Sequence, residues 1–270
     1  MNLFGLEFKA NFGKMIAWAI VLAILIGLLL AFYPLMLEEN TKSIFDSFSN
    51  GLSPSAKAAF GLEEEVDYTN MPQYIAFIYQ YLFVLIMMFA MQLGASSLSK
   101  EQQTGNIEYI YSNPITRSEI INEKLFANIL VYLIFLVILA GVTFGISIVF
   151  QPVDIRKQEI LIALGKIFLG LLCSGLVFLA IGYFFSAMMK SSSGADGLSV
   201  LFVFLLVVLV IVAKVTGYGM IAGYTVFEAF KPIHMLKGNL NFIGMGISLG
   251  IFILGLLLCY VIYGSKELKY

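Results

Sequence analysis

Six stretches of apolar residues divide the chain, and short polar segments separate them. They cover residues 15–37, 73–99, 125–153, 160–189, 198–213 and 242–263. About 20 apolar residues in a helix cross the hydrocarbon core of a bilayer, and the fifth stretch is shorter than that. Lys166 is the one charged residue in the six stretches, and its long side chain can extend toward the interface. The pattern predicts an all-α integral membrane protein, with six transmembrane helices in a single domain over residues 1–270.

Composition supports the same class of protein. Hydrophobic residues make up 60% of the 270 residues and charged residues 12%, whereas soluble domains carry about a quarter charged residues. The formal net charge is −1, so no basic excess is available to neutralise phosphates and no nucleic-acid partner is expected. Cys173 and Cys259 both lie in apolar stretches, which indicates no disulfide framework.

Residues 1–14 precede the first apolar stretch and carry a regular aromatic pattern. Phe4, Phe8 and Phe12 recur every fourth residue, and Glu7 lies off this stripe. Such an amphipathic pattern is typical of a helix that lies in the membrane interface. A separate interfacial helix is therefore predicted here, before the first transmembrane helix.

Residues 38–72 form a polar segment between the first two apolar stretches. Ser53 followed by Pro54 predicts a helix start, because proline is favoured in the first helical turn. An acidic cluster follows at Glu63, Glu64, Glu65 and Asp67. The preferred interpretation is a solvated face on an extracytoplasmic segment, and the alternative is a site for a cation or a cationic substrate.

Residues 214–241 combine apolar and charged residues in an unusual way. Residues 215–227 are apolar and rich in glycine but too short to cross a membrane, and Glu228, Lys231 and His234 follow. Apolar segments of this length are more often re-entrant or interfacial than spanning. The segment is predicted to be re-entrant or extracytoplasmic.

Residues 100–124 are the longest strongly polar run between two predicted spans. Proline disfavours a helical conformation of the residue before it, so a break is predicted at Asn113-Pro114. Thr116 and Glu119 then fit a capping box at a new helix start. Before the break, apolar side chains at Ile107, Ile110 and Tyr111 fall at i, i+3 and i+4. A short amphipathic helix that docks a partner and an ordinary loop both fit this pattern.

The polar run also resembles a known family. The order Glu101, Gly105, Glu108, Pro114, Arg117 and Lys124 is similar to the cytoplasmic signature of permease subunits of type-2 ABC exporters. In that family an acidic residue, a glycine and a glutamate precede a Pro-Ile-x-Arg element, and a lysine begins the next span. The resemblance implies that residues 1–14 are an elbow helix and that residues 100–124 form a cytoplasmic coupling segment.

The resemblance further implies how such a permease works with its partners. The residues expected to contact and couple to an ATPase are Glu101, Gly105, Ile107, Glu108, Ile110, Tyr111, Asn113, Pro114 and Arg117. Two copies of an ABC ATPase subunit would bind ATP and Mg, and no cofactor is expected in this chain itself. A second permease copy or a paralogous permease, together with membrane lipid, completes the expected partners. The expected location is a bacterial plasma membrane with both termini in the cytoplasm.

Charge bias does not decide the orientation. With the N-terminus inside, eight of the Lys and Arg residues fall on each side of the predicted topology. The positive-inside rule therefore favours neither direction. The cytoplasmic placement of both termini rests on the resemblance.

Several catalytic and transport chemistries are not expected. The chain contains no G-x-x-x-x-G-K-[ST] motif, so it is not expected to bind ATP through a P-loop or to be an enzyme by itself. His234 is the only histidine, and Cys173 and Cys259 lie in different spans, which disfavours a zinc site. A Ser-His dyad is not expected either, because His234 lies outside the predicted spans. The predicted spans hold no carboxylate for a coupling ion, which disfavours ion-coupled secondary transport.

The resulting functional prediction is the permease subunit of an ATP-driven exporter. Its substrate would be a peptide, an antibiotic, a lipid or another amphipathic molecule, moved by alternating access. A non-transporting membrane assembly or sensory subunit is the main alternative, and an ion-coupled transporter is a weaker one. The pairs Gly141/Gly145 and Gly246/Gly250 match G-x-x-x-G and predict close helix packing within the chain.

Overall fold

The computed structural model of the chain describes residues 3–104, 115–150, 156–189 and 191–265, and of residues 101–104 it describes the backbone. In these ranges the regular elements are all helices, as the apolar pattern predicts. Six of them are long and apolar enough to cross a membrane. These are α1 (Leu3–Ala31), α5 (Met71–Thr104), α7 (Arg117–Phe150), α8 (Lys157–Met188), α9 (Ser192–Val215) and α13 (Phe242–Ser265).

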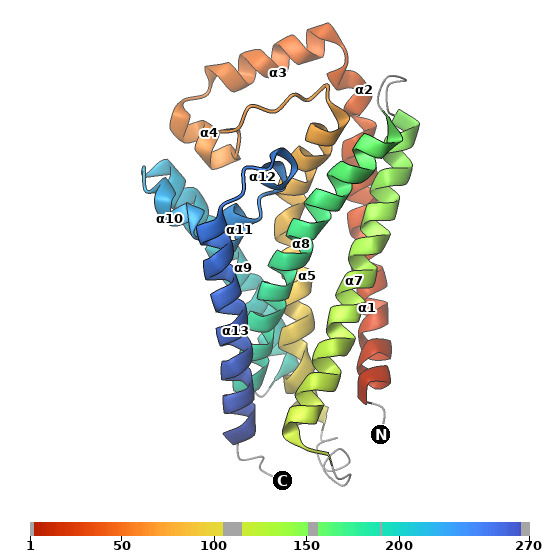
Figure 1. The fold of residues 1–270 in the computed structure, drawn as a ribbon, viewed down its shortest axis with the longest axis vertical. Helices are drawn as coiled ribbons and strands as arrows, with labels where there is room; N and C mark the ends of the chain where they lie inside the picture. The colour runs from red at the N-terminus through yellow and green to blue at the C-terminus, as the bar shows by residue number, and fades with distance from the viewer. Residues whose placement is uncertain (1–2, 105–114, 151–155, 190, 266–270) are drawn as a thin grey trace.

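The six long helices run alternately up and down in one bundle (Figure 1). The start of α1, the end of α5, the start of α7 and the end of α13 lie together at one end, which we call the termini end. The opposite end, which we call the cap end, carries six short helices. They are α2 (Tyr33–Met36), α3 (Glu39–Gly51), α4 (Pro54–Phe60), α10 (Gly219–Gly223), α11 (Val226–Ala229) and α12 (Pro232–Lys237).

Helices α5 and α8 cross closely at the centre of the bundle because glycine removes the side chains at the crossing. A Cβ atom added to Gly94 would collide with the carbonyl oxygen of Leu179, and one added to Gly182 would collide with that of Met91. Backbones that approach this closely gain van der Waals contact, which is a main source of helix association in lipid. These glycines therefore fix the central helix pair.

The predicted G-x-x-x-G pairs do not lie at a helix crossing. A Cβ atom added to Gly141, Gly145, Gly246 or Gly250 would meet no atom within 4 Å. All four glycines lie on exposed faces of α7 and α13. The prediction that they pack helices within the chain is wrong, because spacing alone does not indicate which face of a helix points to a neighbour.

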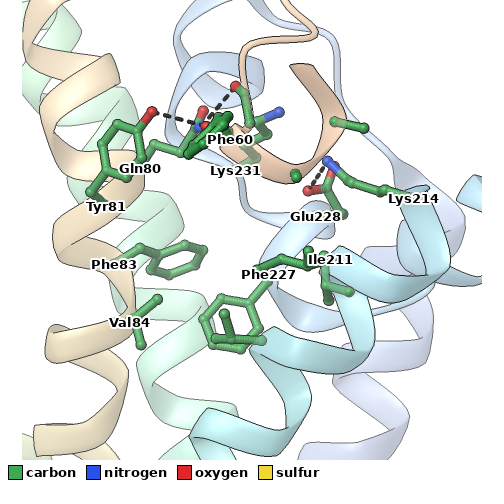
Figure 2. Close-up of a pocket in the computed structure, with 15 residues that line it drawn as sticks. Phe60, Gln80, Tyr81, Phe83, Val84, Ile211, Lys214, Phe227, Glu228 and Lys231 are labelled. Carbon is green, nitrogen blue, oxygen red and sulfur yellow. Dashed lines mark hydrogen bonds and ion pairs between the residues drawn. The ribbon is translucent and has the colours of Figure 1, made fainter. Parts of the chain in front are cut away.

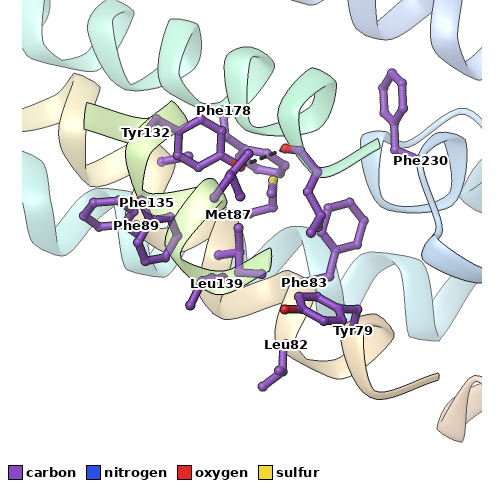
Figure 3. Packing of buried hydrophobic residues seen from close by; sticks show 14 of the residues in the cluster. Tyr79, Leu82, Phe83, Met87, Phe89, Tyr132, Phe135, Leu139, Phe178 and Phe230 are labelled. Carbon is purple, nitrogen blue, oxygen red and sulfur yellow. Dashed lines mark hydrogen bonds between the residues drawn. The ribbon is translucent and has the colours of Figure 1, made fainter. Parts of the chain in front are cut away.

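Aromatic and aliphatic side chains fill the core around α5, α7 and α8 (Figure 3). The rings of Phe89 and Phe135 lie 4.3 Å apart. The buried Tyr132 hydroxyl donates a hydrogen bond of 2.7 Å to the carbonyl oxygen of Leu171, which satisfies the one polar group of that side chain. By contrast, α9 and α13 expose much of their apolar surface, including Leu205 and Leu257. Such surfaces suit contact with lipid.

Helix α1 differs from the sequence prediction at its start. Residues Leu3–Ala31 form one continuous helix, so a separate interfacial helix over residues 1–14 is not found. Glu7 and Asn11 are both buried against other helices. Because they lie one turn apart and in line with the buried Met15, they continue the packed face of the span toward the termini end. The helix ends before α2, in whose first turn Pro34 lies.

Helix α9 is longer than the predicted fifth span of residues 198–213. It begins after Ser191, whose hydroxyl accepts a hydrogen bond of 3.5 Å from the backbone N–H of Gly194, and it runs to Val215. Ser191 thus caps the start of α9, which is a position that serine favours. With 24 residues, α9 is long enough to span.

The segment over residues 214–241 folds into α10, α11 and α12 beside the ends of α5, α8 and α9 (Figure 1). Phe227 contacts the rings of Phe83 and Phe178, at 5.3 and 5.4 Å between centroids. Met235 covers Gly170, where a Cβ atom would collide with it. The segment is therefore anchored into the bundle, and its re-entrant character stays a prediction.

Candidate functional site

Most of the predicted coupling residues fall outside the described residues. Glu101 belongs to the last turns of α5. The residues outside the described ranges are Gly105, Ile107, Glu108, Ile110, Tyr111, Asn113 and Pro114. The predicted coupling helix thus stays a prediction, and the structure describes the two helices that flank it.

Helix α7 begins with the capping box that the sequence predicts at Thr116 and Glu119. The backbone N–H of Thr116 donates to Glu119 Oε2 at 2.7 Å, and the N–H of Glu119 donates to Thr116 Oγ1 at 3.3 Å. These reciprocal bonds satisfy backbone donors that the first helical turn leaves without partners. The start of α7 at Arg117 is therefore well defined.

Arg117 has a structural role that sequence reasoning missed. Its Nη1 donates hydrogen bonds to the carbonyl oxygens of Tyr263 and Gly264, at 3.0 and 2.7 Å. These carbonyls belong to the last turn of α13, where a positive charge complements the helix dipole. In the structure, the end of α13 therefore accepts two hydrogen bonds from this arginine. Its expected contact with an ATPase stays a prediction.

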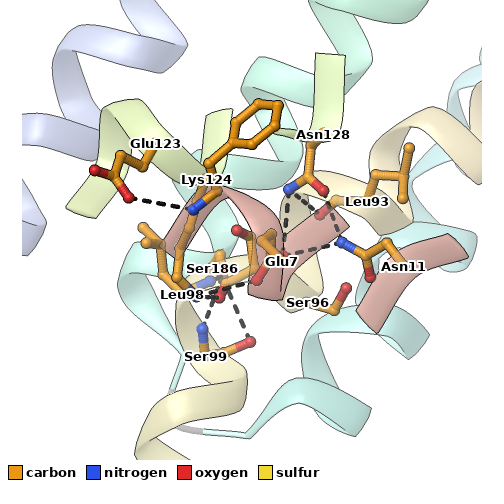
Figure 4. Close-up of polar contacts among 12 residues, drawn as sticks. Glu7, Asn11, Leu93, Ser96, Leu98, Ser99, Glu123, Lys124, Asn128 and Ser186 are labelled. Atoms are coloured by element: carbon orange, nitrogen blue, oxygen red, sulfur yellow. Dashed lines mark hydrogen bonds and ion pairs between the residues drawn. The ribbon is translucent and has the colours of Figure 1, made fainter. Parts of the chain in front are cut away.

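A buried polar network lies next to this end of the bundle (Figure 4). Lys124 Nζ lies 3.3 Å from Glu7 Oε2, and the two side chains are only 2% and 8% exposed. The same ammonium donates to the carbonyl oxygen of Ser97 at 2.7 Å. Asn11 donates to Glu7 and to the Asn128 side chain, at 3.0 and 2.7 Å.

Asn128 extends this network to a fourth helix. Its Nδ2 donates to the Tyr183 hydroxyl at 2.8 Å and to the Leu93 carbonyl at 3.2 Å. The network thus joins α1, α5, α7 and α8 through groups that satisfy one another. An ion pair removed from water is stable only when further hydrogen bonds complete it. The network therefore fixes the positions of these four helices relative to one another near the termini end.

The sequence contained a weak signal for this network. Glu7 was recognised as lying off the aromatic stripe, and Lys124 as the lysine that begins a span. Their distance of 117 positions in the chain gave no reason to pair them. Asn11 and Asn128 carry no formal charge, so a search for charged residues in apolar stretches overlooks them.

At the cap end, the acidic cluster meets basic residues from the other end of the chain. Glu63 lies 2.6 Å from Lys214. Glu64 lies 2.9 Å from His234 Nε2, and that hydrogen bond holds the pKa of Glu64 below its usual value. Lys237 donates to the backbone carbonyl of Glu65. The cluster therefore joins two segments of the cap rather than forming a purely solvated face.

The cation-site interpretation of this cluster finds no support in the described residues. They contain no group of three or more His, Cys, Asp or Glu side chains that could hold a metal ion. Asp67 accepts hydrogen bonds from the side chain and the backbone N–H of Thr69, which lower its pKa. It shapes the local turn before α5.

A pocket of about 170 Å³ lies beneath this cap, between α4, α5, α9 and α11 (Figure 2). Its walls are mainly apolar and include Phe83 of α5, Phe227 of α11 and Ile211 of α9. Lys214, Glu228 and Lys231 stand at its polar end. Small-ligand sites typically combine apolar walls with a few polar groups that fix orientation.

The C-terminal end of α4 covers the pocket and is fastened to α5. Ser53 begins α4 as predicted, with its hydroxyl accepting from the N–H of Ala56 at 3.2 Å. Gly61 ends the helix in the left-handed conformation, with φ of +68°. The carbonyls of Phe60 and Gly61 accept hydrogen bonds from Tyr81 and Gln80, at 2.9 and 3.0 Å.

The comparison with protein families agrees with this architecture over nearly the whole chain. A family model described as ABC-2 family transporter protein matches residues 1–268. The chain belongs to this family. As an ABC-2 transporter protein with six membrane-spanning helices, it is a multi-pass membrane permease of an ABC transporter. Membership implies an ABC ATPase subunit as its partner. A comparison with curated proteins finds no match.

Proposed function

We propose that this ABC-2 permease exports an amphipathic substrate, such as a peptide, an antibiotic or a lipid, at the expense of ATP bound by a separate ATPase. The observation that carries the proposal is the family match over residues 1–268. The exporter assignment and the substrate class go beyond that match. They draw on the resemblance of residues 100–124 to the exporter signature and on the apolar pocket with a charged end.

The arrangement of the termini end supports a coupling route. Residues 105–114 connect α5 to α7, and both of these helices enter the buried network of Glu7 and Lys124. A displacement of the coupling segment by the ATPase would therefore act on helices that are linked to α1 and α8. We propose that two arrangements of these helices open the permease to opposite sides and that ATP binding shifts their populations.

The proposed assembly has two ATPase copies on the termini end and a second permease copy or a paralogue beside this chain. In this arrangement both termini are cytoplasmic. The ATPase subunits supply ATP and Mg, and this chain supplies the membrane pathway. Arg117 links the start of α7 to the end of α13. These linked helix ends would give the ATPase a defined surface around the coupling segment.

The test is to co-purify the tagged chain with its ATPase from native membranes and to reconstitute the complex in vesicles. ATP-dependent substrate uptake into inside-out vesicles is expected, together with ATP hydrolysis that the permease stimulates. Glu108→Lys should lower ATPase recovery or uncouple hydrolysis from transport, because it reverses a charge on the proposed docking surface. Glu39→Lys, on α3 at the opposite end of the molecule, is the matched control.

Two outcomes would contradict the proposal. A Glu108→Lys complex with wild-type yield, hydrolysis and transport would remove the coupling role of that glutamate. Labelling of Ser112→Cys by an impermeant thiol reagent from outside intact cells, with Ser55→Cys protected, would reverse the orientation and exclude the proposed ATPase surface.

A further inference from the structure

One lysine in the pocket under the cap differs from the other charged groups around it. Lys231 lines the pocket and is only 4% exposed. Within the described part of the chain, its ammonium makes no hydrogen bond and no ion pair within 4.0 Å. Burial lowers the pKa of Lys231, and Glu228 partly offsets that effect. A lysine whose side chain is this deeply buried and whose ammonium has no direct partner is unfavourable, so its retention calls for a reason.

The carboxylates near Lys231 are already engaged. Lys214 Nζ lies 2.6 Å from Glu63 and 2.7 Å from Glu228, so one ammonium bridges both acids. Glu64 is bound to His234. The cation that remains without a contacting anion at the pocket is therefore Lys231, among the residues that the structure describes.

The rest of the pocket is suited to a hydrocarbon chain. Below the charged end lie the rings of Phe83 and Phe227 (Figure 2), and Val207 and Val210 also line the pocket. Ile211 also lines the pocket and is 36% exposed on the outer side of α9, so the pocket borders the lipid-facing surface. Its volume of about 170 Å³ is below the roughly 300–1,000 Å³ of drug-sized sites. It can hold a head group and the first part of a chain, with the remainder in the bilayer.

We propose that this pocket binds an amphipathic anion, with its carboxylate or phosphate head at Lys231 and its hydrocarbon chain between α5, α9 and α11. An anionic head would supply the charge-assisted hydrogen bond that Lys231 lacks. The apolar walls would bury the first part of the chain. Identification of this ligand as transported cargo rests on the proposed function, whereas binding itself does not.

The test uses the full-length chain in nanodiscs of phosphatidylcholine, without ATP. The probe is oleic acid with a diazirine in its tail, and cross-linked peptides are mapped by mass spectrometry. Labelling is expected on the parts of α5, α9 or α11 that line the pocket. Lys231→Met should raise the probe concentration at half-saturation by about tenfold or more, because a hydrogen bond to a charged group is lost. Lys231→Arg should retain binding.

The controls separate charge recognition from folding and from partition into the bilayer. Lys42→Gln changes an exposed lysine at the same end and should leave labelling unchanged. The neutral probe, oleyl alcohol with the same diazirine, should bind wild type and Lys231→Met equally weakly. Without a probe, Lys231→Met should unfold at the same or a higher temperature, because it removes a buried charge that lacks a contacting partner.

Nanodiscs that contain phosphatidylglycerol distinguish the source of the anion. If this bilayer lipid displaces the oleic acid label, the occupant is a membrane phospholipid, and if the label persists, it is a single-chain amphiphile. Both results support the anionic site. Equal labelling by the acid and the alcohol, unchanged affinity in Lys231→Met, or labels confined to other surfaces would overturn it. None of these results affects the ATPase test, because binding is measured without nucleotide.

Discussion

The termini end and the cap end both hold opposite charges from distant parts of the chain, but in different surroundings. Glu7 and Lys124 are almost completely enclosed, and amide and carbonyl groups supply further hydrogen bonds to them. At the cap end, the Glu63 side chain is 37% exposed. Water can replace a partner there, which it cannot do at Glu7.

This difference matches the mechanical demands on the two ends. The buried network, whose disruption costs much free energy, holds α1, α5, α7 and α8 together beside the proposed ATPase surface. The cap is fastened by partly exposed ion pairs and by two hydrogen bonds from α5 to the end of α4, so it can open at lower cost. A pocket under a weakly held cap can exchange its ligand more readily than one enclosed by the core.

The largest predicted effect is at the termini end. Glu7→Ala removes the charge beside Lys124 and leaves a buried ammonium without its carboxylate, which commonly costs about 3–5 kcal/mol. The thermal unfolding midpoint of the purified chain in detergent should fall strongly. The double variant Glu7→Gln with Lys124→Met should recover most of that loss, because it removes both charges. A Glu7→Ala protein as stable as wild type would show that the pair is not desolvated.

The second effect concerns the fastening of the cap. Gly61 has a φ of +68°, and a Cβ atom there would collide with Gln80 Nε2. Gly61→Ala should cost about 1–2 kcal/mol locally, since a left-handed residue is strained when it carries a side chain. Hydrogen exchange in α4 should accelerate while that of α5 stays unchanged. Gly51→Ala, where no atom lies within 4 Å of the added Cβ, is the control, and equal exchange in both variants would contradict the assignment.

Exposed charge at the cap end should matter less. Glu63→Gln breaks the ion pair with Lys214, but Lys214 keeps Glu228 at 2.7 Å. The expected loss in unfolding free energy is about 0–1 kcal/mol, as for other solvent-exposed pairs. Glu39→Gln serves as the comparison in denaturant unfolding. A loss of several kcal/mol at Glu63 would show that the cap is as tightly closed as the termini end.

The smallest effect is a pH dependence of the cap. The hydrogen bond from His234 lowers the pKa of Glu64 below its ordinary value of 4.5. The folded state therefore gains stability from this carboxylate above pH 4.5, and the gain is lost as pH falls through the lowered pKa. The protection of amides between α4 and α5, relative to their intrinsic exchange rates at each pH, should fall on acidification in this range. Glu64→Gln should flatten that fall, and an unaltered profile would exclude Glu64 as its origin.

Most of the fold could be predicted from the sequence because it depends on local patterns. Long apolar stretches determine the number of spans, and proline, serine and the capping box at Thr116 determine where helices begin. The predictions of helix packing failed because the sequence does not indicate which face of a helix points to a neighbouring helix. Gly141 and Gly246 fit a packing motif but face outward, while Gly94 and Gly182, which belong to no pair singled out in the sequence, form the closest crossing.

The candidate site was less accessible to such reasoning. The sequence indicated the coupling segment through its resemblance to a family, and Glu108 and its neighbours lie outside the described residues. It indicated the charges of residues 214–241 but not their partners. The pairing of Lys214 with Glu63 and Glu228, and the burial of Lys231 without a contacting anion, depend on where α9, α11 and α12 meet the cap.

The sequence alone determined that this protein is a six-helix membrane protein, because hydropathy and span length are properties of contiguous residues. Its signature between the second and third spans also pointed to the ABC-2 family. The tertiary structure alone decided which glycines bring helices together, which charges are buried and which lysine lies in a pocket. Those features depend on contacts between residues more than a hundred positions apart, such as Glu7 and Lys124. Local patterns do not specify such contacts, since each helix presents several faces that could pack.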